Sequence, residues 1–232
     1  MIVTVGLVLL ALPLLFLIYA YVGYPALLWL LARRRTYRVV RQDPPHWPEI
    51  TVTLPVYNEA AAIAATLDHI LALDYPPERR HVLVISDASD DGTDDIVQRY
   101  HDRGVQLLRL PRRGGKTAAE NAAGPHLRGS LVVSLDATIR VQPTAVKALV
   151  RAFLDPEVGV ASGRDYSVPS NAGETNRAES NYVSYEMWVR SLETSLGTIV
   201  GASGCFYAIR RDLFDHLFPE ALSRDFASPL IA

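Results

Sequence analysis

The sequence predicts an α/β fold, a mostly parallel sheet with flanking helices, preceded by one transmembrane helix. From residue 50 onwards, short β-branched and apolar runs alternate with segments of helical periodicity. This alternation is typical of parallel strands joined by right-handed crossover helices that cover both faces of a sheet. By contrast, residues 1–32 contain no Asp, Glu, Lys, Arg or His, although 21% of the 232 residues are charged.

The apolar segment 2–32 is longer than the roughly 20 residues that a spanning helix needs. A signal peptide would have a basic start and a shorter apolar core, and this segment has neither. Basic residues follow it instead: Arg33, Arg34, Arg35, Arg38 and Arg41. The positive-inside rule then predicts an integral protein of the plasma or inner membrane, with the following domain in the cytoplasm. We expect Pro25 to kink or break the helix.

Residues 33–49 read as a basic, proline-rich juxtamembrane linker, because three prolines within five residues exclude a helix and favour an extended spacer. The remaining residues, 50–232, form the predicted domain. Its first strand is "ITVTLPVY" at 50–57, and further apolar runs predict strands at 81–88, 105–110, 131–137 and 158–166. A glycine-rich turn leads into a short strand within 201–211.

Helices are expected between these strands. Residues 59–73 carry apolar side chains at helical spacing, and 91–103 begin with acidic residues, as a helix N-terminus prefers. The helix at 115–127 should break near Gly124, and Pro143 suits the first turn of a helix at 143–154. Aromatic residues recur every three or four positions in a helix at 176–197. Core packing is the simpler interpretation of these aromatic residues, and contact with an acceptor sugar is the alternative.

Polar and acidic residues follow three of the strands, in "PVYNE", "SDASDDGT" and "DAT". A parallel sheet binds ligands beyond the carboxyl ends of its strands. Asp and Asn also form turns, which would explain any one of these clusters but not all three together. The sequence lacks G-x-G-x-x-G and phosphate-loop motifs, so a dinucleotide or ATP site is disfavoured. A net charge of −2 suggests no nucleic-acid surface, and scattered His residues with one Cys disfavour zinc.

Six segments in order resemble the motifs of glycosyltransferase family 2. They are "TLPVYNE", "VISDASDDGT", "RGGKTAAEN", "LDAT", "GASGCFYAIRRDLF" and "SRDFASPL", over about residues 50 to 230. The family comprises inverting enzymes that use nucleotide sugars and includes cellulose, chitin and hyaluronan synthases. The resemblance implies a GT-A fold, a UDP- or GDP-sugar donor, and transfer with inversion at the anomeric carbon.

The resemblance also implies roles for individual residues. Those that match the nucleotide-sugar-binding motifs are Pro55, Tyr57, Glu59, Asp87, Asp91, Lys116, Asn121 and Asp136. Asp136 matches the first aspartate of a D-x-D metal motif, which implies a Mg²⁺ or Mn²⁺ cofactor. Asp225 in "SRDF" matches the general base. Independently of the family, an acceptor hydroxyl needs a carboxylate to take its proton, and cationic groups such as Lys116 and Arg113 can stabilise a leaving diphosphate. Asp225 could otherwise be a helix N-terminal charge.

Two departures from the family pattern matter. Thr138 stands where D-x-D has its second aspartate, and its neutral oxygen is a weak ligand for a hard cation. A metal would then be held through the diphosphate and Asp136, or held weakly. The chain also stops at "ASPLIA" without the Q-x-x-R-W motif and further membrane helices of membrane synthases. We therefore expect a fragment that lacks the C-terminal part of the domain; the alternative is a shortened form without an acceptor clamp of that kind.

The sequence thus predicts an inverting glycosyltransferase, a hexosyltransferase of the EC 2.4 class, at the cytoplasmic face of a membrane. Its partners would be a UDP- or GDP-sugar, a saccharide or lipid-linked acceptor and the lipid bilayer, with no nucleic acid. The alternative is a non-catalytic or truncated remnant that binds the nucleotide sugar without turnover. A nucleotidyltransferase of similar topology is disfavoured, because that class generally has a glycine-rich loop after its first strand.

Overall fold

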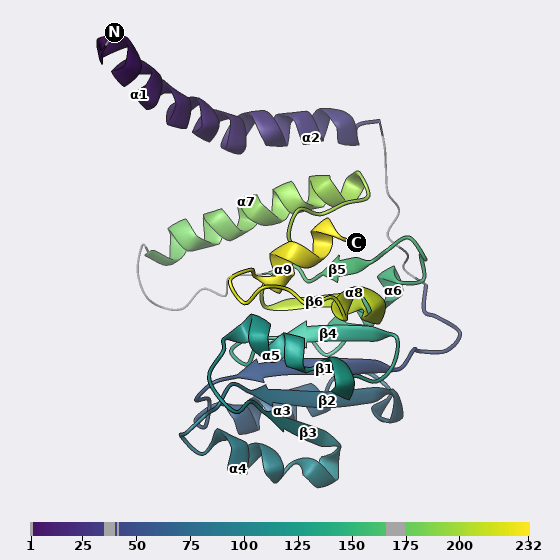
Figure 1. Cartoon of the computed structure of the whole chain (residues 1–232). Helices are drawn as coiled ribbons and strands as arrows, with labels where there is room; N and C mark the ends of the chain where they lie inside the picture. Colours follow the sequence, from purple (N-terminus) through teal and green to yellow (C-terminus); the bar gives the residue numbers. More distant parts are fainter. Residues whose placement is uncertain (1, 35–39, 41, 166–174) are drawn as a thin grey trace. The chain divides into compact units, whose positions relative to one another are not determined.

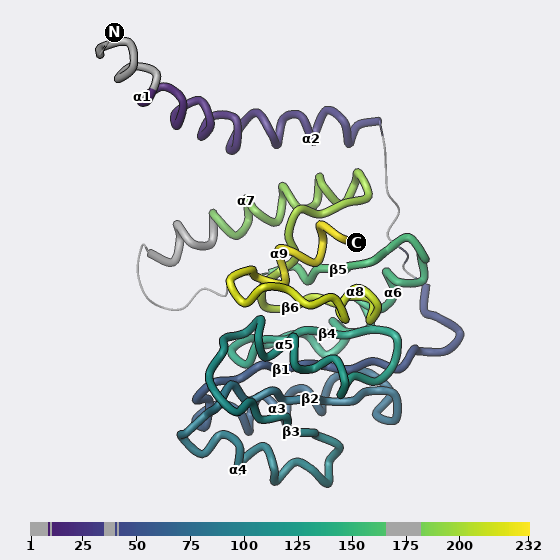
Figure 2. Tube along the Cα trace, in the orientation of Figure 1, coloured from purple at the N-terminus to yellow at the C-terminus, as the bar shows by residue number. Residues whose placement is uncertain are grey.

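The computed structural model describes residues 2–34, 40, 42–165 and 175–232 (Figure 1). Within it, the chain divides into two compact units. A helical unit comprises Met1–Arg38 with Asp165–Val200, and a sheet unit comprises Val39–Arg164 with Gly201–Ala232. Figure 2 traces the path of the chain through each unit. The linker prediction for 33–49 falls partly outside the described residues, and 42–49 contain no helix or strand.

The sheet unit is built on six strands in the order β3-β2-β1-β4-β6-β5. Their bounds are β1 Ile50–Val56, β2 Arg80–Ser86, β3 Val105–Arg109, β4 Leu131–Leu135, β5 Val160–Ser162 and β6 Phe206–Arg210. The four strands from β3 to β4 run parallel, and β6 pairs antiparallel with both β4 and β5. The predicted mostly parallel sheet is therefore confirmed.

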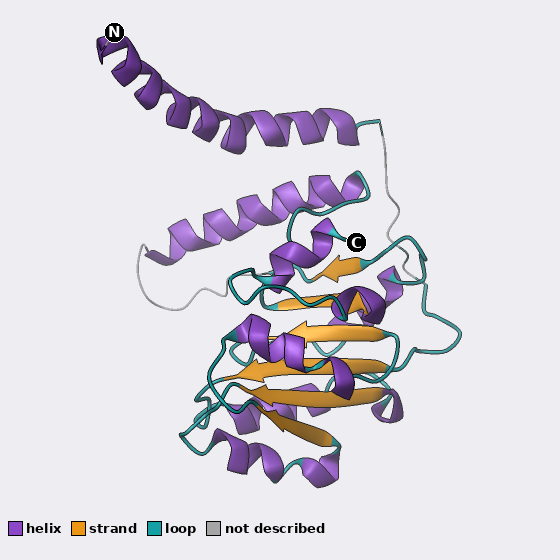
Figure 3. Cartoon of the chain, viewed as in Figure 1, coloured by secondary structure: helices purple, strands orange, loops and turns teal. Residues whose placement is uncertain are grey.

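Helices cover both faces of this sheet (Figure 3). They are α3 Ile63–Leu71, α4 Thr93–Gln98, α5 Lys116–Ala122, α6 Ala145–Ala152, α8 Arg211–Phe214 and α9 Arg224–Ala227, with short 3-10 turns Pro77–Arg79, His101–Arg103, Gly124–His126 and Ser228–Leu230. Six of the seven residues of β1 are buried, alternate ones facing opposite layers, which explains the nearly continuous β-branched run in its sequence. The main core lies between β1, β2 and β4 and helices α3 and α6.

Several helices are shorter than their sequence patterns predict. Helix α3 begins at Ile63 rather than 59, because the Glu59 carbonyl first closes a turn by accepting bonds from the amides of Ala62 and Ile63. Helix α5 ends before Gly124, at the predicted break. Strands β5 and β6 were both predicted, but the long-range pairing that places β6 between β4 and β5 was not.

The helical unit contains α1 Ile2–Ile18, a π-helical turn at Tyr19–Gly23, α2 Tyr24–Ala32, and α7 Thr175–Ser195. The α-helix is interrupted beside Pro25, as predicted, and resumes at Tyr24. The π-helical turn precedes it, and such a turn absorbs the backbone bond that a proline cannot make. In the described part of the chain, one helical stretch, Ala11–Ala32, is long and apolar enough to cross a membrane.

Helix α7 contacts both α2 and the π-helical turn within this unit. The Tyr24 hydroxyl donates to Glu193 at 2.6 Å, and the Tyr21 and Tyr185 rings stack with centroids 5.9 Å apart. Tyr182 and Trp188, by contrast, are 58% and 45% exposed. Core packing is therefore the wrong interpretation for these two side chains, although it suits the neighbouring buried Met187.

Candidate active site

The segments that follow β1, β2 and β4 lie at one edge of the sheet, as parallel strand order requires. Two of these loops are tied to each other by a reciprocal pair of hydrogen bonds. The Asn58 amide donates to Asp90 Oδ1 at 2.8 Å, and the Asp90 backbone N–H donates to Asn58 Oδ1 at 2.9 Å. Asn58 has a φ of 55°, a left-handed conformation that asparagine tolerates better than most residues. These two bonds therefore fix the loops after β1 and β2 against each other.

Asp91 supports the same pair of loops from the β2 side. Its carboxylate accepts hydrogen bonds from the backbone of Ala60 at 2.9 Å and from the backbone of Thr93 at 3.0 Å, and it also accepts one from the Thr93 hydroxyl. These bonds, the Thr93 hydroxyl first, hold the pKa of Asp91 below its usual range. The structure thus places Asp91 in the turn that begins α4, and its predicted contact with a nucleotide remains a prediction.

Asp87 holds the glycine-rich loop before α5. Its two carboxylate oxygens accept hydrogen bonds from the backbone N–H groups of Gly114 at 2.7 Å and Gly115 at 2.8 Å. Gly115 has a φ of 85°, which an L side chain rarely adopts, so the cradle depends on glycine there. The loop also carries Arg113, whose guanidinium lies 3.9 Å from the centre of the exposed Tyr57 ring. This stacked pair offers a flat cationic surface at the end of β1.

Lys116 and Asp136 form an ion pair at the centre of this edge. Lys116 Nζ, at the start of α5, lies 2.6 Å from Asp136 Oδ1 and also donates to the Gly204 carbonyl. Burial lowers the pKa of the Lys116 ammonium, but the hydrogen bond and charge of Asp136, with Glu120 and Asp225, outweigh it and raise the pKa overall. Lys116 is therefore a fixed positive charge. Both side chains keep about a third of their surface exposed, 35% and 30%, so a ligand can reach them.

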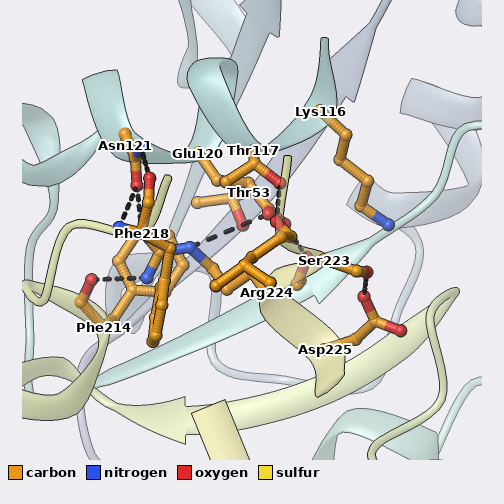
Figure 4. A network of polar contacts seen from close by, with 12 residues as sticks. Thr53, Lys116, Thr117, Glu120, Asn121, Phe214, Phe218, Ser223, Arg224 and Asp225 are labelled. Atoms are coloured by element: carbon orange, nitrogen blue, oxygen red, sulfur yellow. Dashed lines mark hydrogen bonds and ion pairs between the residues drawn. The ribbon is translucent and has the colours of Figure 1, made fainter. Parts of the chain in front are cut away.

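Asp225 lies in the first turn of α9, close to this ion pair. Its backbone carbonyl accepts a hydrogen bond from Ala202 at 2.9 Å, and its carboxylate accepts one from the Ser223 hydroxyl. A Cβ added to Gly204 would sit 3.2 Å from the Asp225 carboxylate, so the carboxylate lies directly against the glycine that Lys116 contacts. The structure therefore brings together Lys116, Asp136 and Asp225, from three distant parts of the sequence. Figure 4 shows Lys116 and Asp225 of this group.

The other predicted site residues sit at the edge in less direct positions. Pro55 is half-buried within β1, and the Glu59 backbone N–H donates to the Thr93 hydroxyl at 2.8 Å. The Asn121 amide group donates to the Phe218 carbonyl at 2.7 Å and accepts from the Phe218 backbone at 3.3 Å. Asn121 thus holds the C-terminal segment in this structure, and its contact with a nucleotide remains a prediction.

Sequence reasoning missed two charged residues beside the site, Glu120 and Arg224, each only 1% exposed. Burial raises the pKa of Glu120, an effect partly offset by Lys116, Ser134 and Arg224. The sequence contained one pattern that involves Glu120, its position four residues after Lys116 on the same helix. Such a pair of opposite charges is normally exposed on a helix surface, so it did not predict a buried residue at the site.

Few side chains at this edge of the sheet could ligate a metal ion. In the part of the chain that the structure describes, no group of three or more His, Cys, Asp or Glu residues could hold an ion. Asp136 is the one carboxylate of the "DAT" segment, and Thr138 is exposed. Mg²⁺ is commonly bound through one or two carboxylates plus substrate phosphates, so this set fits an ion that arrives with a diphosphate.

Comparison with known proteins identifies the family of the chain. Residues 51–218 match the family model described as "Glycosyl transferase family 2". The chain is 26% identical over 198 residues to the beta-monoglucosyldiacylglycerol synthase of Trichormus variabilis, a match that covers 83% of this chain and 42% of that protein. It is 28% identical over 166 residues to the poly-beta-1,6-N-acetyl-D-glucosamine synthase of Staphylococcus aureus, covering 70% of this chain and 39% of that protein. The chain therefore spans less than half the length of these curated relatives.

A solved structure is similar over most of the chain. It is a mannosyltransferase from Pyrobaculum calidifontis in complex with GDP-Man and Mn²⁺, with a TM-score of 0.71 and 29% sequence identity. The match covers 91% of this chain and 60% of that one. The similarity confirms the GT-A fold.

Proposed function

Because the chain belongs to glycosyltransferase family 2, we propose that it transfers a sugar from a UDP- or GDP-sugar to an acceptor hydroxyl, with inversion at the anomeric carbon. The observation that supports this most strongly is the grouping of Lys116, Asp136 and Asp225 around Gly204. A fixed cation and a half-buried carboxylate base are the two groups that such a transfer needs.

In the proposed reaction, the Asp225 carboxylate takes the proton of the acceptor hydroxyl while the acceptor oxygen attacks the anomeric carbon. The bond from that carbon to the diphosphate oxygen breaks, and the nucleoside diphosphate leaves with the bonding electrons. Lys116 lies where its ammonium can stabilise the charge that develops on the leaving group. The Tyr57–Arg113 stack and Asp87 lie at the nucleotide end of the same edge.

A divalent cation, Mg²⁺ or Mn²⁺, would be held by Asp136 together with the donor diphosphate. When bound, it would neutralise charge on the phosphates. Thr138, in place of a second carboxylate, leaves this chain with one anionic protein ligand from that segment, and Lys116 supplies a second positive charge beside it.

We further propose that the enzyme is anchored through the apolar helix, with the sheet unit on the cytoplasmic side and a saccharide or lipid-linked acceptor. The length and composition of Ala11–Ala32 and the basic residues after it support this placement. Extraction of the protein from membranes by alkaline carbonate would contradict it.

The function is tested by titrating the purified protein with a panel of UDP- and GDP-sugars by calorimetry, and by assaying sugar transfer to membrane and saccharide acceptors. We expect Asp136→Ala to abolish donor binding. Asp225→Asn should bind the donor normally but lower kcat about a hundredfold or more, the scale of a lost general base. Donor binding without turnover, unchanged by Asp225→Asn, would instead identify a non-catalytic nucleotide-sugar-binding protein.

A further inference from the structure

Helix α5 presents different residues to two neighbours. Lys116 reaches Asp136, as described above, whereas three other residues of α5 hold the C-terminal segment 214–225. The Thr117 hydroxyl donates to the Leu222 carbonyl at 2.7 Å, and Asn121 makes its two bonds to the Phe218 backbone. Glu120 faces Arg224. These residues, at positions 117, 120 and 121, share one helical face that points to this segment (Figure 4).

Arg224 of the C-terminal segment is buried, with 1% of its surface exposed. One of its terminal nitrogens donates to the Phe214 carbonyl at 2.7 Å and the other to Asn121 Oδ1 at 2.6 Å. Its guanidinium also lies over the rings of Phe214 and Phe218, at 4.3 Å and 5.1 Å from their centres. A buried guanidinium must be paired, because an isolated charge in the interior is very costly.

Glu120 provides the opposite charge, but the geometry is not that of a strong bond. Its Oε2 lies 3.8 Å from Arg224 Nε, beyond hydrogen-bond distance, and neither atom has a hydrogen-bond partner among the described residues. Ser134 of β4 donates to the other carboxylate oxygen at 3.0 Å. A buried ion pair of this kind adds little net stability compared with apolar residues, so its presence calls for another explanation.

The explanation lies in the residue that follows Arg224. Asp225 has its carboxylate against Gly204, and Lys116 donates to the carbonyl of the same glycine. Lys116 and Glu120 are on one short helix, and Arg224 and Asp225 are consecutive. The contact between Glu120 and Arg224 therefore links the helix that carries Lys116 to the turn that carries Asp225.

We propose that Glu120 and Arg224 are positioning residues, whose buried ion pair fixes the carboxylate of Asp225 opposite the Lys116–Asp136 pair. This inference rests on the proposed function, since it assigns the pair to the placement of the proposed base. Neither residue touches the reacting atoms. Their effect is on the geometry of the transfer step and not on the affinity for the donor.

The test compares Glu120→Gln with a matched surface variant, Glu78→Gln, whose side chain is exposed in the turn before β2. We expect Glu120→Gln to lower kcat by about tenfold or more while the donor KM stays within roughly twofold, because a small misplacement of a catalytic group costs rate rather than donor contacts. Glu120→Asp, which keeps the charge, should recover part of the lost rate. An unchanged kcat, or a kcat and KM that change together, would overturn the inference.

A double variant separates positioning from stability. Glu120→Leu with Arg224→Leu removes both buried charges together, so it should unfold at a higher denaturant concentration than Glu120→Gln, which leaves Arg224 uncompensated, while kcat stays low. A double variant with wild-type stability and wild-type kcat would overturn the inference.

The failure of this inference can be distinguished from the failure of the proposed function. If the wild-type protein transfers no sugar, the proposed function fails, and the placement is still measured by amide hydrogen exchange in α9. Faster exchange at 223–228 in Glu120→Gln than in Glu78→Gln supports the positioning role, and equal exchange overturns it.

Discussion

The carboxylate of Asp87 should be worth more to the stability of the sheet unit than any exposed acid beside it. Only 5% of its surface is exposed, and it accepts hydrogen bonds from the consecutive amides of Gly114 and Gly115 at 2.7 and 2.8 Å. Asp87→Ala removes both acceptors at once. Asp87→Asn keeps one acceptor oxygen but turns an amide N–H₂ group towards a second backbone donor.

The magnitude follows from these two bonds. A hydrogen bond to a charged group contributes about 1.5–3 kcal/mol. Gly114 is half-buried and Gly115 is exposed, so water can replace part of what is lost, and the lower limit applies to each bond. We therefore expect Asp87→Ala to lower the free energy of unfolding by about 3 kcal/mol and Asp87→Asn by roughly 1.5 kcal/mol.

The assay is urea unfolding followed by far-ultraviolet circular dichroism, with Asp95→Asn as the control. Asp95 is an exposed acid on α4, close in sequence to Asp87, and its variant should stay within about 0.5 kcal/mol of the wild type. If Asp87→Ala and Asp95→Asn unfolded at the same urea concentration, the two backbone hydrogen bonds would not hold the glycine loop, and the reasoning would be refuted.

Three further predictions concern acid stability, backbone geometry and metal affinity. Because hydrogen bonds depress the pKa of Asp91, the stability that its carboxylate contributes is complete above the usual pKa of 3.8 and is lost as the pH falls through the lower folded-state pKa. The unfolding free energies of Asp91→Asn and the wild type, measured from pH 6 to 2, should therefore converge at the acid end. A constant difference would contradict this. Gly129→Ala should destabilise the protein by roughly 2–5 kcal/mol in thermal unfolding, because Gly129 has a φ of 77° and the added Cβ would overlap the Glu49 carbonyl. Gly104 has a φ of 85°, but a Cβ added there would meet no atom within 4 Å, so Gly104→Ala should cost only about 1–2 kcal/mol. Thr138→Asp should tighten Mn²⁺ binding in the presence of UDP or GDP, measured by calorimetry; an unchanged affinity would mean that a second carboxylate was never the limiting ligand.

The sequence by itself determined the elements and the edge of the sheet at which the site lies. The continuous β-branched run of β1 and the helical periodicity of the segment before Leu71 reflect burial, and burial acts on residues close in sequence. The polar residues after β1, β2 and β4 were predicted to converge, because parallel strands end at one edge. Local sequence also predicted the break at Gly124.

Other features could not be read from local patterns. Pro25 predicted a kink or break, and the α-helix is interrupted beside it, but the form of the interruption, a π-helical turn at Tyr19–Gly23, was not predicted. The position of β6 between β4 and β5 depends on an antiparallel pairing between distant segments. The aromatic spacing in α7 suggested a buried face, but Tyr182 and Trp188 are exposed, since periodicity alone does not show which positions another helix will cover.

Only the tertiary structure decided how the charged groups of the candidate site are arranged. The sequence placed Lys116, Asp136 and Asp225 in the site one at a time, each by resemblance, and gave no reason to link Glu120 with Arg224. A charge pattern in a sequence predicts exposure, since exposed charges are the rule. That a Glu and an Arg far apart in the chain are buried against each other follows from the fold alone, because only folding creates an interior in which each becomes the other's counter-charge.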